Sequence, residues 1–147
     1  MTKALFRLCL RLALCAMLAL PAQAQSGIQI QTDEATQDFP NSINFHLVAS
    51  SGAAIDSVIL HYGTNGRTCQ SGEVRQTVDF DHGATVDADW QLEFKRSGSF
   101  PPGVQVWWQW EVHDASGAQR LTEKQTLVVE DARFNWRTLA RDHVTLI

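Results

Sequence analysis

The feature that most constrains the fold is a strict alternation of apolar and polar positions between residues 104 and 113. One set of alternate positions is wholly apolar and comprises Val104, Val106, Trp108, Trp110 and Val112. The intervening set comprises Gln105, Trp107, Gln109, Glu111 and His113. Because successive side chains of a β-strand point to opposite faces, this period of two predicts a strand with one buried face. We expect Trp108 and Trp110 to supply much of the core.

Shorter segments with the same period occur along the rest of the chain, separated by turn residues. The others are Ile28–Ile30, Ile43–Ala49, Val58–Tyr62, Val74–Phe80, Val86–Phe94 and a strand that ends at Val129. Turns are predicted at Ser50–Gly52 and Asp114–Gly117. About seven short strands, each with one apolar face, are typical of two antiparallel sheets packed face to face. The sequence therefore predicts an all-β sandwich of immunoglobulin or fibronectin type III kind over residues 25–130.

The chain begins with the pattern of a secretory signal peptide over residues 1–24. Three basic residues precede the apolar run Leu12–Leu20, and Ala22-Gln-Ala24 offers a cleavage site of the small-x-small type. That run is far shorter than the roughly 20 apolar residues that span a bilayer. We expect cleavage after Ala24, a secreted or extracytoplasmic location, and no membrane attachment afterwards. Of the three cysteines, only Cys69 would remain, so no internal disulfide is expected and a fibronectin-like sandwich is favoured.

The charge of the expected mature chain argues against two classes of partner. All 16 acidic residues lie beyond residue 24, whereas three of the 12 basic residues, Lys3, Arg7 and Arg11, lie before it. Nine basic residues against 16 acidic ones leave a net charge of −7. Nucleic acids and anionic membranes require clustered positive charge. We therefore expect neither of them to be a ligand.

Several segments of the chain carry a resemblance to a known family. They are Ile43-Asn-Phe45, Ser57–Tyr62, Pro101-Pro-Gly103 with Val106-Trp-Trp108, Asp114–Gly117, and Val129-Glu-Asp131 followed by Arg133-Phe-x-Trp136-x-x-Leu139. Together they resemble the amino-terminal sandwich of secreted peptidase-MA-like (gluzincin) proteins. The resemblance implies that a zinc metallopeptidase domain follows the sandwich, and that the Arg133–Trp136 segment joins the two. Residues 131–147 are then expected to be a linker and the first strand of that missing domain, and that strand has no successor in this chain to pair with.

The family's catalytic signature is absent from this sequence. Such enzymes place two zinc-binding histidines and a general-base glutamate in a His-Glu-x-x-His helix. None of the five histidines here is followed by glutamate. We therefore expect no enzymatic activity and no cofactor, and we expect an accessory domain whose partner is the catalytic-type domain of a longer parent. The alternative is a free-standing extracellular module that binds a glycan or a protein.

Two groups of residues are candidate sites. The carboxylates of Asp79, Asp81, Asp87 and Asp89 could hold calcium through oxygen ligands, although their spacing does not match an EF-hand and a solvated acidic turn is the simpler interpretation. The second group contains the interface candidates Trp107, Arg133, Phe134 and Trp136. Trp107 lies on the polar side of its strand and is expected to be exposed unless something covers it. A domain junction, a glycan platform and an isolated surface tryptophan are all compatible with that position.

Overall fold

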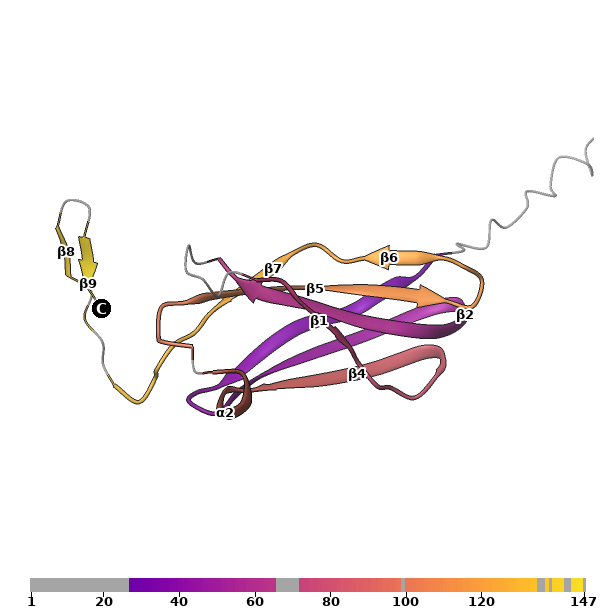
Figure 1. Ribbon diagram of the computed structural model, residues 1–147. Coiled ribbons are helices and arrows are strands. Elements are labelled where there is room, and N and C mark those ends of the chain that lie inside the picture. Colours follow the sequence, from indigo (N-terminus) through magenta and orange to yellow (C-terminus); the bar gives the residue numbers. More distant parts are fainter. Residues whose placement is uncertain are drawn as a thin grey trace, which may run out of the picture.

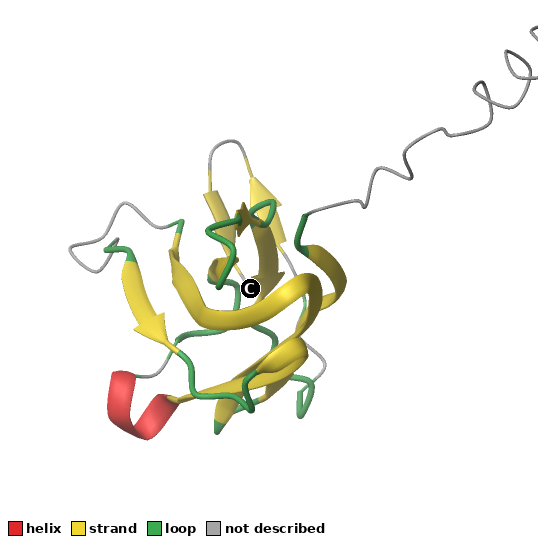
Figure 2. Cartoon of the chain, turned by 90° about the vertical axis from the view of Figure 1, so that its right-hand side faces the viewer, coloured by secondary structure: helices red, strands yellow, loops and turns green. Residues whose placement is uncertain are grey.

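The computed structural model describes residues 27–65, 72–98, 100–134, 137, 139–141 and 144–146. Seven strands form one antiparallel sheet that curls on itself (Figures 1 and 2). They are β1 (Gln29–Asp38), β2 (Ser42–Thr64), β3 (Val74–Thr77), β4 (Gly83–Glu93), β5 (Gln105–Asp114), β6 (Gln119–Leu121) and β7 (Gln125–Val128). One helical turn, α2 (Phe94–Ser97), follows β4. No described helix has the length and apolar character needed to cross a membrane.

The organising element is β2, a strand of 23 residues. Its first half, up to Ser50, pairs with β1 and β4, and its second half, after Ile55, pairs with β3 and β5. Ile55 itself pairs with both β4 and β5. The predicted turn at Ser50–Gly52 is wrong, because the chain stays extended there. Register shifts on both sides of Ile55 indicate β-bulges. Such bulges bend a strand instead of reversing it, so that one strand serves both halves of the fold.

The two halves of β2 pack against each other through their apolar faces. The Phe45 ring in the first half lies 6.1 Å from the Tyr62 ring and 5.8 Å from the Trp108 ring, measured between centroids. Alternate residues of both halves are fully buried, and so are Trp110 and Val112 of β5. This shared interior confirms the predicted all-β, sandwich-like fold with about seven strands and the predicted core positions of Trp108 and Trp110. The finer likeness to fibronectin type III domains stays a prediction.

Other elements differ from the predictions at their ends. The first strand extends through the polar stretch to Asp38, because backbone pairing with β2 holds it at the sheet edge without an apolar pattern. The predicted seventh strand is split into β6 and β7, which both pair with β5. Thr122 spans the gap, since its amide donates to the carbonyl of Trp110 (2.8 Å) and its hydroxyl accepts from the Trp110 amide (2.9 Å).

The last described strands form a separate two-stranded sheet. β8 (Leu139–Arg141) pairs antiparallel with β9 (Val144–Leu146), and Figure 1 places both beyond the end of the main sheet. The predicted strand at the end of the chain is therefore present. Its partner is the preceding segment of the chain, a pairing that the sequence pattern does not indicate.

The predicted turn after β5 is confirmed and is built around the buried side chain of Asp114. Its Oδ1 atom accepts hydrogen bonds from the amide and hydroxyl of Ser116 and from the amide of Ala118, at 2.9, 2.6 and 3.0 Å. Its Oδ2 atom accepts from the Ser51 hydroxyl, which ties the turn to the bend of β2. Gly117 closes the turn with a φ of 87°, a conformation that glycine adopts without steric cost.

Asp114 predicts a pH dependence of stability. The hydrogen bonds from Ser116 and Ser51 lower the pKa of its carboxyl from 3.8 to about 2. Because the folded-state pKa is the lower one, the stabilisation is complete above the ordinary pKa and is lost as the pH falls through about 2. The free energy of unfolding, measured with urea at a series of pH values, should fall less between pH 4 and pH 2 for Asp114→Asn than for the wild type. Parallel declines of the two proteins would contradict this assignment.

Candidate functional site

A cleft of about 340 Å³ opens beside the second half of β2. It is lined by Tyr62, Gln76, Trp90, Gln91, Leu92, Glu93 and Arg96. These residues come from β2, β3, β4 and α2, so the cleft lies where the two halves of the sheet approach each other. Its size lies at the lower end of the range for small-molecule sites, which is about 300–1,000 Å³.

The aromatic side of the cleft is formed by Trp90 and Tyr62. Their ring centroids are 5.1 Å apart with an interplanar angle of 37°. Trp90 shares the inward face of β4 with Ala88 and Leu92, but it remains only partly buried. Its ring centroid is also 6.1 Å from that of Phe45, its partner in the register of β2 and β4. The aromatic surface is thus anchored in the core while one part of Trp90 stays accessible.

Burial raises the pKa of the Tyr62 phenol above its ordinary value of 10.0. The phenol therefore keeps its proton at neutral pH, and its hydroxyl can both donate and accept a hydrogen bond. This property suits an uncharged ligand with hydroxyl groups.

The rim of the cleft is polar. The Gln76 amide donates to the carbonyl of Thr77 (2.7 Å), and the Gln91 amide donates to the Ser42 hydroxyl (3.1 Å). Arg96 Nε lies 3.7 Å from Glu93 Oε2 across one helical turn. Amides, a carboxylate and a guanidinium beside an aromatic surface can hydrogen-bond the hydroxyl groups of a ligand whose C–H groups pack on the rings.

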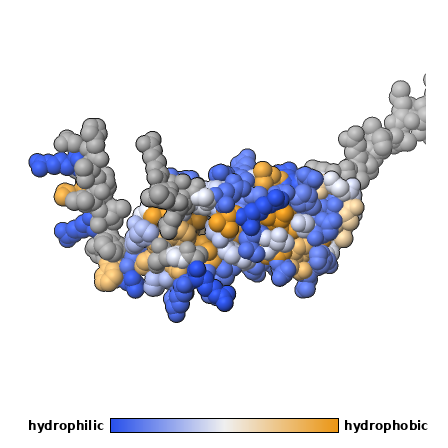
Figure 3. All heavy atoms as spheres, in the orientation of Figure 1, coloured by the Kyte–Doolittle hydropathy of each residue, from blue (hydrophilic) through white to orange (hydrophobic). Residues whose placement is uncertain are grey.

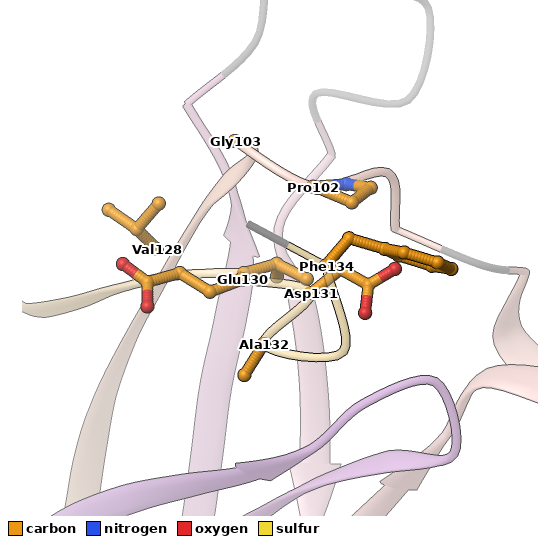
Figure 4. Close-up of a pocket in the computed structure, with 8 residues that line it drawn as sticks. Pro102, Gly103, Val128, Glu130, Asp131, Ala132 and Phe134 are labelled. Atoms are coloured by element: carbon orange, nitrogen blue, oxygen red, sulfur yellow. The ribbon is translucent and has the colours of Figure 1, made fainter. Parts of the chain in front are cut away.

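A second hollow, of about 300 Å³, lies where the chain leaves β7 (Figure 4). Pro102 and Phe134 stand on one side of it, and Val128 and Glu130 on the other. Phe134, a predicted interface residue, is 62% exposed, and Val128, which lines the same hollow, is 42% exposed. Two apolar side chains therefore reach the surface here. Elsewhere on the face shown in Figure 3, apolar residues are scattered among hydrophilic ones.

The predicted linker begins in a fixed conformation. Arg133 makes a bidentate ion pair with the buried Asp131, with Nε–Oδ1 and Nη2–Oδ2 distances of 2.8 Å. This pair lowers the pKa of the Asp131 carboxyl, because the hydrogen bonds favour its charged form. The guanidinium also lies 5.3 Å from the Phe39 ring centroid and 5.5 Å from that of Phe134. The remaining interface candidate, Trp136, and Cys69 lie outside the described residues.

Trp107 is buried, because other residues of this domain cover its ring. The side chain is only 7% exposed. Trp107 pairs with Gly63 in the register of β5 and β2, and the ammonium of Lys124 lies 3.7 Å from the ring centroid. Glycine leaves room for a flat ring, and the ammonium favours the ring face electrostatically. Trp107 therefore offers no open platform for a glycan.

The four predicted calcium ligands do not come together. Among the described residues, the group with convergent metal-binding atoms is His46, Asp87 and Asp89. Asp79 and Asp81 are exposed and lie outside that group. The sequence pattern missed His46, because it lies more than 40 positions away and reaches the aspartates only through strand pairing.

A polar network on the outer face of β2, β3 and β5 was also missed. His61 is 8% exposed, with Nδ1 2.6 Å from Glu73 Oε1 and Nε2 2.8 Å from Glu111 Oε2. Glu111 also accepts hydrogen bonds from Arg75 and lies 2.7 Å from His113 Nε2. The hydrogen bonds from His113 and His61 lower the pKa of the Glu111 carboxyl. These contacts cross-link three strands, and the strand register that creates them has no local sequence signal.

The fold and the cleft together define an all-β, sandwich-like protein with an aromatic and polar cleft beside its central strand. No protein-family model matches the chain, and no curated protein matches it. Among solved structures, the chain is similar to one described as "Crystal structure of Br derivative BhCBM56". That match has a TM-score of 0.48 and 12% sequence identity, and covers 67% of this chain and 90% of the other. So distant a similarity assigns neither a family nor a ligand.

Proposed function

We propose that this protein is a non-catalytic binding module that holds a short neutral saccharide in the cleft beside β2. The observation that carries the proposal is the pairing of Trp90 and Tyr62 beneath a rim of amide and charged side chains. Sugar rings present C–H faces that pack on aromatic rings and hydroxyl groups that need directional hydrogen-bond partners. The net charge of −7 expected for the mature chain disfavours an anionic saccharide.

The absence of a second acid along the cleft supports binding over hydrolysis. Glycoside hydrolysis ordinarily uses two carboxyl groups flanking the scissile bond. Among the residues that line the described cleft, Glu93 supplies the single carboxylate, and Arg96 lies beside it. The predicted signal peptide is consistent with a role outside the cytoplasm, where polysaccharides are accessible.

Binding can be tested by isothermal titration with soluble neutral glucans, xylans, mannans and chitooligosaccharides. Trp90→Ala is expected to weaken binding at least tenfold, because truncating an aromatic residue at the centre of a binding site commonly costs about 2 kcal/mol. Gln76→Ala should weaken it less, and it leaves the core intact because Gln76 lies at the rim. Circular dichroism of both variants separates lost binding from lost folding.

Phe134→Ala provides the matched control, since it removes an exposed aromatic ring outside the cleft. Its affinity should equal that of the wild type. If Phe134→Ala loses saccharide binding while Gln76→Ala and Trp90→Ala retain it, the binding site is the hollow beside Phe134 and not the cleft. Failure to bind any saccharide of the panel would reject the proposed function.

A second candidate function is that of an accessory domain that packs against a further folded domain, as in a peptidase-MA-like parent. The observation that favours it is the exposed apolar surface of Val128 and Phe134, beside a linker start fixed by Asp131 and Arg133. The test is the coding DNA beyond Ile147. An in-frame His-Glu-x-x-His sequence there would support this role, whereas a stop codon directly after Ile147 in independent isolates would count against it.

A further inference from the structure

Strand pairing brings three metal-binding side chains together on the outer face of the first half of the sheet. His46 of β2 pairs with Asp89 of β4, and Asp87 lies two residues earlier on the same face of β4. His46 Nδ1 is 2.9 Å from Asp89 Oδ1 and 3.5 Å from Asp87 Oδ1. One potential ligand atom from each residue lies within 4.8 Å of the other two. A single cation can therefore contact all three.

The backbone that carries these side chains is well supported. The neighbouring residues Phe45, Leu47 and Ala88 alternate with the cluster and are fully buried in the core. The two aspartates are 71% and 75% exposed, whereas His46 is 29% exposed. A cation at this position would keep open coordination sites for water. It would also offset the repulsion between two carboxylates that point the same way from one strand.

The donor set discriminates between metals. Calcium takes six to eight oxygen ligands, and this cluster supplies an imidazole nitrogen and only two carboxylates. Nitrogen and carboxylate ligands suit zinc and neighbouring first-row divalent ions, with water completing the coordination. We propose that His46, Asp87 and Asp89 form a surface site for a first-row divalent transition metal, with Zn²⁺ as the probe.

This site is distinct from the proposed saccharide cleft. Asp89 and Trp90 are consecutive residues of β4, so their side chains leave opposite faces of the strand. Metal binding and saccharide binding can therefore be tested separately, and the failure of one leaves the other standing.

The test is an isothermal calorimetric titration of the untagged, metal-stripped protein with Zn²⁺. We expect one ion per chain, with affinity reduced at least tenfold in His46→Gln and in Asp89→Asn, since each removes a direct ligand. His113→Gln is the matched control, because it removes a histidine that contacts Glu111 on another part of the sheet. Its zinc affinity should equal that of the wild type. Circular dichroism establishes that each variant is folded.

A second measurement locates the ion without relying on variants. Co²⁺ should perturb the backbone NMR signals of residues 45–47 and 87–90, and should leave those of residues 111–113 sharp. Three outcomes would overturn the proposal. One is a lack of Zn²⁺ uptake at millimolar concentration, which would make the cluster an ion pair only. The others are zinc binding that survives His46→Gln but not His113→Gln, and a preference for Ca²⁺ over Zn²⁺.

Discussion

Replacing Trp110 by alanine is expected to lower the free energy of unfolding by about 3–5 kcal/mol, the usual cost of deleting a large buried aromatic side chain. The indole is fully buried in the middle of β5 and is the largest of the completely buried side chains. Its backbone also holds Thr122 between β6 and β7. A cavity at this position would be bordered by paired strands on both sides, which restricts collapse of the surrounding residues.

Urea unfolding followed by circular dichroism measures this effect. Trp110→Phe should cost less than Trp110→Ala, because it retains most of the volume. It also removes the indole N–H, which has no hydrogen-bond partner within the described part of the chain. Leu121→Ala on the neighbouring β6 is the surface control, since Leu121 is 55% exposed and its change should stay within about 0.5 kcal/mol. An unchanged midpoint for Trp110→Ala would show that the side chain is not part of the core.

The elements that could be predicted from the sequence are those with an apolar alternation of their own. The face of β5 that carries Trp108 and Trp110 is buried as its period of two indicates. By contrast, β1 beyond Ile30 consists largely of polar residues at a sheet edge, and its pairing with β2 is a backbone property without a side-chain signal. The long β2 was divided in the prediction because Ser50-Ser-Gly52 has turn composition. The same residue types are compatible with the bulges around Ile55, which bend the chain without reversing it.

The candidate sites depend on information that the local pattern does not contain. Tyr62 and Trp90 meet because β2 bends, so that its second half, which carries Tyr62, packs against its first half, which pairs with β4. A period of two does not indicate which strands become neighbours. His46 reaches Asp89, 43 positions further along the chain, only through the register of β2 and β4. The aspartates can be recognised in the sequence, but His46, the third residue of the proposed metal site, cannot. Register and bending must be known before such sets of residues can be recognised.

Gly63 explains why Trp107 is buried on a face that the alternation marks as polar. The two residues are cross-strand partners, and the indole occupies the space that a side chain at position 63 would fill. A Cβ atom added to Gly63 would lie 2.9 Å from Trp107 Cζ2 and 2.8 Å from the carbonyl oxygen of Gly72. Both distances are shorter than ordinary contacts, and one of them involves backbone that cannot rotate away.

Gly63→Ala is therefore expected to destabilise the fold by about 1–3 kcal/mol, the usual range for overpacking a well-packed position. Gly52→Ala is the matched control, because a Cβ atom there meets nothing within 4 Å. That change should be neutral or slightly stabilising, since alanine reduces the conformational entropy of the unfolded chain. Urea midpoints of the two variants and the wild type provide the comparison.

A double-mutant cycle separates the two contacts at Gly63. Trp107→Ala removes the ring but leaves the carbonyl of Gly72 in place, so it should relieve only part of the cost of Gly63→Ala. Full additivity of the two changes would mean that the ring does not press on position 63, and would contradict the cross-strand explanation for the burial of Trp107. If Gly63→Ala costs stability in the wild type but none in the Trp107→Ala background, the ring accounts for the entire clash. The Gly72 carbonyl would then have to move without cost.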